Sequence, residues 1–224
     1  LIFIFIFVSL AVVSATVVSV SGSSQKICQL IGDKDRQFNI PTPTQTGVNA
    51  KVYGTDLGVA FQSNGKLIFL FGDTITHPLM NSPDSIAYTS DYSPNDCIDL
   101  KFYVDENSKF KIPEVAGISL KAFEVPMEGI EINGQNYVFF TTDSTGEGQM
   151  GRSVLTKFNE GDFSFDYLYD FSTGKFINVH IVRVDNSRFD GLPENSGKGL
   201  LIYGSGTYRK SNLYLSYISE DSLE

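Results

Sequence analysis

The chain has 224 residues, with 17 Lys or Arg against 26 Asp or Glu, which gives a formal net charge of −9. Its 42% hydrophobic and 19% charged residues are globular proportions and exclude an intrinsically disordered chain. The acidic balance, without any basic run, excludes nucleic acid as the main partner, because phosphate binding needs clustered Lys and Arg.

The N-terminal segment is strongly apolar. Residues 1–25 carry no charge, and 16 of the first 20 are apolar. This pattern predicts a secretory signal peptide, with Val13-Ser14-Ala15 as a small-residue cleavage site. A membrane anchor is the alternative, since about 20 apolar residues can span a bilayer. Under either interpretation residues 26–224 are exported, and we expect a secreted, extracellular protein that has no membrane partner once the signal is cleaved.

Two cysteines, Cys28 and Cys97, follow the apolar segment. In an exported protein they favour a single disulfide, because the compartment is oxidising. Two unpaired thiols are the alternative. We expect a monomer.

Short strands and hairpin turns recur along the rest of the chain. Asn-Gly or similar turn pairs occur at residues 64–65, 133–134, 160–161 and 196–197, and no segment after the signal has a sustained helical period. The predicted strands are Val59–Gln62, Lys66–Phe71, Asp84–Thr89, Gln135–Thr141, Ser153–Phe158, Phe163–Tyr169, Ile177–Val184, Gly199–Tyr203 and Leu213–Ile218. An all-β sandwich, barrel or propeller fits this pattern, and rough groups of four strands favour a propeller.

Three motifs are interpreted as structural. Gly146–Gly151 has the G-x-G-x-x-G pattern of a dinucleotide site, but a strand follows it instead of a helix, so we expect a glycine-rich hairpin loop. Pro41–Thr46 is predicted to be an extended connector. His77 and His180 are too few and too isolated for a zinc site, although His77 precedes a proline in a loop and is a candidate for lining a site.

Two aspartates are the candidate catalytic pair. Asp56 lies in Gly54–Gly58, and Asp73 ends the apolar run 67–71, with the Asn64-Gly65 turn between them. A hairpin at that turn pairs Val59–Gln62 with Leu67–Leu70 and brings both aspartates to the end opposite the turn. Two convergent carboxyl groups are the minimum for glycoside hydrolysis, one as acid and the other as nucleophile or base. Loop capping by both aspartates is the structural alternative.

These strings resemble one known family. Gly54-Thr55-Asp56-Leu57-Gly58, an Asn-Gly turn and Phe69-Leu70-Phe71-Gly72-Asp73-Thr74 look like the opening of domain of unknown function 4185, which includes microbial endo-D-arabinanases. Weaker similarities, as at Asp84–Asp91 and Gly204–Ser216, extend the resemblance over about residues 26–219.

The resemblance implies a five-bladed β-propeller that cleaves internal bonds of arabinofuranose polymers. It implies that Asp56 and Asp73 are the catalytic residues and that the substrate is a polysaccharide, and it favours a retaining mechanism. We count three to four blades in residues 26–224, so we expect the propeller to be incomplete here, with a C-terminal part missing. An acidic funnel would accommodate a structural calcium ion, and no other cofactor is expected.

Five further residues are candidates for substrate binding, each with a structural alternative. Glu128 is either a third carboxylate of the site or a solvated loop acid. Arg152 and Arg209 would bind sugar hydroxyls or else pair with structural carboxylates. Tyr208, with Tyr53, would stack on a furanose ring. His77 completes the set.

The main rival function is a non-catalytic carbohydrate-binding or adhesion propeller, which has no need of two convergent carboxylates. A sialidase-like hydrolase is a weaker alternative, because it would require an arginine triad and repeated Asp-box turns. Glu160-Gly161-Asp162-Phe163 only faintly resembles such a turn.

Overall fold

The computed structural model describes residue 22 and residues 25–56, 58–76, 83–121, 123–146 and 149–224. Within these residues the all-β prediction is confirmed: the strands form five antiparallel sheets, and the helices are α1 (Thr46–Ala50) and three 3-10 turns. The 3-10 turns are Pro94–Asp96, Asn186–Arg188 and Glu220–Ser222. No helix in the described ranges has the length and apolarity that a bilayer crossing requires.

The first sheet contains β4 (Val59–Ser63), β5 (Lys66–Phe71), β7 (Ser85–Thr89) and β8 (Lys101–Phe102), in that spatial order. The β4–β5 hairpin has the predicted register, because Val59 pairs with Leu70 and Gln62 with Leu67. Its turn residues Asn64 and Gly65 both have positive φ, of 46° and 74°. A two-residue turn of this kind matches the twist of the strands that it joins.

The second sheet contains β9 (Pro126–Ile132), β10 (Gln135–Thr142), β11 (Arg152–Asn159) and β12 (Ser164–Ser172). β9 was not among the predicted strands, because Pro126 and Gly129 weaken its β pattern. Pro126 is the first residue of the strand, where a missing N–H is tolerated. Gly129 lies against the ring of Phe61, which a Cβ would meet at 2.2 Å.

The glycine-rich segment 146–151 leads into β11 and not into a helix, as predicted. Gly148 of the motif lies outside the described residues.

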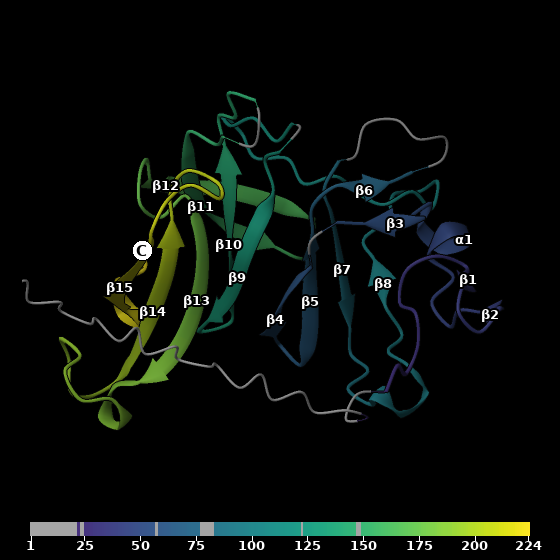
Figure 1. Ribbon diagram of the computed structural model, residues 1–224, viewed down its shortest axis with the longest axis horizontal. Coiled ribbons are helices and arrows are strands. Elements are labelled where there is room, and N and C mark those ends of the chain that lie inside the picture. The colour runs from purple at the N-terminus through teal and green to yellow at the C-terminus, as the bar shows by residue number, and fades with distance from the viewer. Residues whose placement is uncertain (1–21, 23–24, 57, 77–82, 122, 147–148) are drawn as a thin grey trace, which may run out of the picture.

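The third sheet contains β13 (Asn178–Asp185), β14 (Lys198–Ser205) and β15 (Leu213–Ser219). Consecutive strands pair throughout, with Val182 opposite Leu201 and Leu201 opposite Tyr217. The three sheets stack in chain order (Figure 1), and their first strands, β4, β9 and β13, contact one another in sequence.

Three hydrophobic clusters fill the spaces in this stack. One lies between the first and second sheets and includes Ile68, Ile86 and Phe140. Another joins the second and third sheets and includes Phe139 and Leu200. The last covers the outer face of the first sheet. None of the sheets is closed on itself, and the five-blade count remains a prediction.

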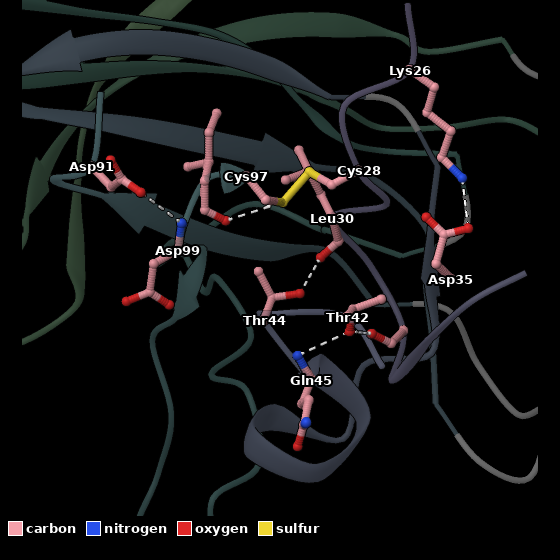
Figure 2. The surroundings of a disulfide bond; sticks show 12 residues. Lys26, Cys28, Leu30, Asp35, Thr42, Thr44, Gln45, Asp91, Cys97 and Asp99 are labelled. Carbon is pink, nitrogen blue, oxygen red and sulfur yellow. Dashed lines mark hydrogen bonds and ion pairs between the residues drawn. A yellow bond between two sulfur atoms is a disulfide. The ribbon is translucent and has the colours of Figure 1, made fainter. Parts of the chain in front are cut away.

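The N-terminal segment covers the outer face of the first sheet. It contains the two-stranded sheet of β1 (Lys34–Asp35) and β2 (Ile40–Pro41), while β3 (Gly54–Thr55) pairs with β6 (Thr74–Ile75). The predicted connector 41–46 leads into α1, and its threonines are buried and hydrogen-bonded. Thr42 and Thr44 donate to the carbonyl oxygens of Gly32 and Leu30, at 2.5 and 2.6 Å (Figure 2).

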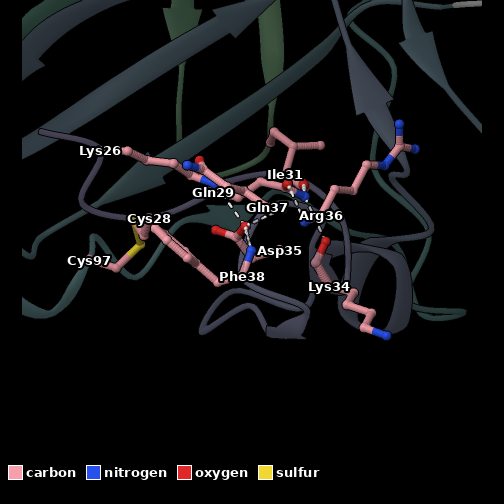
Figure 3. Close-up of polar contacts among 10 residues, drawn as sticks. All are labelled: Lys26, Cys28, Gln29, Ile31, Lys34, Asp35, Arg36, Gln37, Phe38 and Cys97. Carbon is pink, nitrogen blue, oxygen red and sulfur yellow. Dashed lines mark hydrogen bonds and ion pairs between the residues drawn. A yellow bond between two sulfur atoms is a disulfide. The ribbon is translucent and has the colours of Figure 1, made fainter.

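Asp35 organises the first turn of this segment (Figure 3). Its Oδ1 accepts from Lys26 Nζ at 2.7 Å and from the backbone N–H groups of Gln37 and Phe38 at 2.9 and 3.1 Å. The Lys26 hydrogen bond, together with these N–H groups, holds the pKa of Asp35 below its ordinary value. The predicted signal or anchor lies almost wholly outside the described residues and remains a prediction.

Cys28 and Cys97 form the disulfide that the sequence favours (Figure 2). It links the N-terminal segment to the loop between β7 and β8 across 69 residues of sequence. We expect the Cys28→Ala/Cys97→Ala variant to lose about 2–4 kcal/mol of unfolding free energy, because the bond constrains the unfolded chain. Urea denaturation of the two proteins measures this loss, and equal midpoints would contradict the prediction.

Candidate functional site

The β4–β5 hairpin brings the two candidate aspartates together. The Asp56 N–H donates to the Asp73 carbonyl oxygen at 2.8 Å, and the Gly72 N–H donates to the Asp56 carbonyl oxygen at 3.0 Å. These bonds extend the hairpin past β4 and β5 to the short β3–β6 pair, where Thr55 lies opposite Thr74. The two aspartates therefore lie side by side at the end of the hairpin opposite its turn.

Both aspartates line a pocket of about 810 Å³. The first residues of β4, β9 and β13 also line it, so it lies at the end of the stack where these three strands begin. The lining residues are Asp56, Gly58, Val59, Asp73, Phe123, Val125, Pro126, Met127, Met150, Asn178, Val179 and Tyr208. The pocket thus combines two carboxyl groups with a largely apolar wall.

The surroundings of Asp73 favour its protonated form. Burial, followed by the negative charge of Asp56, raises the pKa of the Asp73 carboxyl above its ordinary value. Burial disfavours the charged form of an acid, and a nearby carboxylate adds like-charge repulsion. Asp73 is therefore better suited than an ordinary surface aspartate to carry a proton near neutral pH.

A third acid, Asp84, was not identified from the sequence. It lies directly before β7 and is 6% exposed. Burial, and then the charges of Asp73 and Glu124, raise the pKa of Asp84 to about 8. The available signal was an aspartate at the start of the apolar run Ser85–Thr89. Sequence alone does not show that this end of the strand is buried.

Glu124, the acid just before Val125 and β9, is also buried. Its Oε2 accepts the Lys121 N–H at 2.6 Å, and its Oε1 accepts the Ser144 N–H at 2.8 Å. Both carboxylate oxygens thus have backbone donors, so Glu124 joins two loops beside Asp84.

Among the predicted substrate-binding residues that the structure describes, Tyr208 is the one that lines the pocket. It lies between β14 and β15, and its side chain is 45% exposed. The guanidinium of Arg209 is 4.7 Å from the centre of the Tyr208 ring, which supports the ring through a cation–π contact. Arg209 itself is not among the lining residues. Tyr53 is exposed and does not line the pocket either.

Glu128 points elsewhere. It is 4% exposed in β9, and its carboxylate accepts the N–H groups of Gly129 at 3.0 Å and Ile181 at 3.1 Å. His180 Nδ1 lies 2.6 Å from its Oε2. Glu128 therefore joins the second sheet to β13, and it does not contribute to the pocket wall.

Arg152, at the start of β11, also has structural partners. Its Nε donates to Asp143 at 2.6 Å, and its Nη1 donates to Asp170 on the neighbouring β12. It is not among the residues that line the pocket. His77 lies outside the described residues.

A second pocket, of about 320 Å³, lies between α1 and β8. Its two charged residues, Asp99 and Lys101, are 3.1 Å apart and pair with each other. It lacks a pair of carboxyl groups, so we place the candidate site in the larger pocket. Over the described ranges no three His, Cys, Asp or Glu side chains are arranged to hold a metal ion.

Comparison with known proteins adds no further assignment to this geometry. No protein-family model matches the chain, and no match is found among curated proteins.

Proposed function

We propose that this protein is a secreted glycoside hydrolase that cleaves internal glycosidic bonds of arabinofuranose-containing polysaccharide. The observation that carries the proposal is the pair of neighbouring aspartates, Asp56 and Asp73, in the wall of one large pocket. A module that only binds sugar gains nothing from two adjacent carboxyl groups, which repel each other when both are charged. A hydrolase uses this repulsion to keep one of them protonated.

Asp73 is the general acid in this mechanism, because burial and the charge of Asp56 raise its pKa. It donates its proton to the leaving glycosidic oxygen as the bond to the anomeric carbon breaks. Asp56, as the carboxylate, either attacks the anomeric carbon or removes a proton from an attacking water. Its charge also stabilises the positive charge that develops on the sugar ring.

The apolar wall of the pocket is suited to sugar rings. Phe123 and Tyr208 are 52% and 45% exposed, so their rings are free to cover the apolar faces of sugar rings. In the same wall, the Asn178 Oδ1 is an acceptor for a sugar hydroxyl, while its Nδ2 donates to the Gly206 carbonyl oxygen at 3.0 Å. A volume of about 810 Å³ falls in the usual range of ligand pockets.

The architecture that we propose for this site is a five-bladed propeller. Two four-stranded antiparallel sheets and one of three strands, each with its strands arranged in chain order, have the form of propeller blades. The first strands of all three begin at the pocket, as innermost strands around a common channel would. The resemblance of Gly54–Gly58 and Phe69–Thr74 to the family with endo-D-arabinanases supports the same interpretation. The Cys28–Cys97 disulfide is consistent with export.

Digestion of two polymers tests this function. The protein is incubated separately with D-arabinan and with L-arabinan, and the products are separated by anion-exchange chromatography. We expect a ladder of oligosaccharides from one of the two polymers, because an endo-acting enzyme cuts at internal bonds. Folded protein that releases no product from either, yet is retarded in a gel containing one polymer, would contradict the proposal and favour the carbohydrate-binding alternative.

A further inference from the structure

Asp84 lies on a segment next to that of Asp73 but outside the pocket wall. Ser85 pairs with Phe71 across β5 and β7, and the Thr74 N–H donates to the Pro83 carbonyl oxygen at 3.0 Å. These two contacts enclose the segments that carry Asp73 and Asp84 and hold them next to each other. Asp73 lines the pocket, whereas Asp84 does not.

Asp84 is buried, with 6% of its surface exposed. Its neighbours Thr74 and Ser85 are both fully buried, and their hydroxyl oxygens are 2.6 Å apart. The charged groups that act on Asp84 are Asp73 and Glu124, and both are acidic. No described residue donates a hydrogen bond to the Asp84 carboxyl, in contrast to Glu124, whose two oxygens have backbone donors. A buried carboxyl between two acids is most stable when it is neutral.

We propose that Asp84 is a positioning residue of the candidate site, which holds a proton in reserve for Asp73 so that the two carboxyl groups work as one proton-carrying pair. This inference rests on the proposed hydrolase function for its catalytic meaning. The pairing itself is a property of the fold and can be measured without substrate.

The proton balance of the pair is simple. When Asp56 acts as the base on water, Asp73 is left as a carboxylate after it has protonated the leaving oxygen; the O–H bond of Asp84 then breaks and a new O–H bond forms on Asp73. The negative charge moves from Asp73 to Asp84, and a proton from solvent restores the pair later. When Asp56 is instead the nucleophile, Asp73 recovers its proton from the attacking water, and Asp84 keeps its own proton. Because the pKa of Asp84 is raised to about 8, the pair keeps one proton over most of the neutral range and loses it around that pH.

Asp84→Asn removes the reserve proton and keeps a neutral side chain of the same shape. The alkaline limb of the kcat/KM profile on the cleaved arabinan is then set by Asp73 alone. We expect it to move to lower pH by at least about one unit, which is about a tenfold loss at a fixed pH on that limb. The matched control is Asp221→Asn, the same change at an exposed position outside the pocket, and it should leave the profile unchanged.

A titration without substrate tests the pairing separately. The carboxyl carbon of Asp73 is followed by NMR from about pH 4 to 9 in the wild-type protein and in Asp84→Asn. We expect the wild-type signal to show a second inflection near pH 8, when Asp84 ionises, and the variant signal to show a single one.

The two measurements separate the possible failures. If no variant hydrolyses either arabinan but the second inflection is present and is lost in Asp84→Asn, the hydrolase proposal fails and the carboxyl pair stands. If the second inflection is absent, or persists in the variant, the pair is wrong whatever the activity. An alkaline limb that Asp84→Asn leaves in place would show that Asp84 has only a structural role.

Discussion

Asp73→Asn is expected to lower arabinan hydrolysis by about 10²–10⁴-fold while leaving the affinity for the polymer nearly unchanged. The amide has the shape of the acid but does not protonate the leaving oxygen. The loss therefore appears in kcat and not in KM. Initial rates of oligosaccharide release by the wild-type and variant proteins measure it, with polymer affinity followed by retardation in an arabinan gel.

A substrate with a good leaving group distinguishes the roles of the two aspartates. An aryl arabinofuranoside with an acidic phenol needs little protonation, so we expect it to restore much of the rate to Asp73→Asn. Asp56→Asn should remain inactive on it, because the second carboxylate is needed whatever the leaving group. If Asp56→Asn recovers and Asp73→Asn does not, the roles are exchanged. Full activity of both variants would remove the pair from the mechanism.

Asp84→Asn is expected to stabilise the protein at neutral and alkaline pH. The pKa of Asp84 is about 8 in the folded state, against 3.8 as the ordinary value that applies to the unfolded chain. Between these two pH values the folded state holds a proton that the unfolded state has lost. The free energy of unfolding of the wild-type protein therefore falls as pH rises through this interval, by up to about 1.4 kcal/mol per pH unit.

The Asp84→Asn variant has no carboxyl group at this position, so its free energy of unfolding does not fall in this way as pH rises. We expect its advantage to be close to zero near pH 4 and to reach at most about 5 kcal/mol near pH 8, where Asp84 is fully ionised in the unfolded wild-type chain. Urea denaturation at several pH values measures it, with Asp221→Asn as the control. An advantage that does not change with pH would mean that Asp84 titrates normally. In combination with the kinetic profile, the expected result is a variant that is more stable but less active at alkaline pH.

The hairpin that carries the candidate pair could be predicted from local signals. The Asn64-Gly65 turn and the apolar strand after it set the register of β4 against β5, and this register leaves Asp56 beside Asp73. The same kinds of signal predicted most of the other strands to within a few residues. β9 was missed because its Pro126 and Gly129 contradict local β propensity. Gly129 is explained by the ring of Phe61, which is far away in sequence and leaves no room for a Cβ.

The other site residues depend on contacts that the sequence does not encode locally. Glu128 and Arg152 were equally good candidates for sugar binding until their partners were known. Those partners include Ile181 on β13 and Asp170 on β12. A charged side chain on a strand faces either a ligand or another strand, and only the packing of the sheets decides between the two.

The amino-acid sequence was sufficient for the all-β class and for the hairpin with its two aspartates, because turn residues and strand alternation act over short distances. It favoured the disulfide between the two cysteines but left two unpaired thiols as an alternative. The tertiary structure was needed for the burial of Asp84, the common pocket at the starts of β4, β9 and β13, and the structural role of Glu128. These properties arise from how sheets stack. Burial, which governs the charge state of an acid, is a sum over neighbours that are remote in the chain.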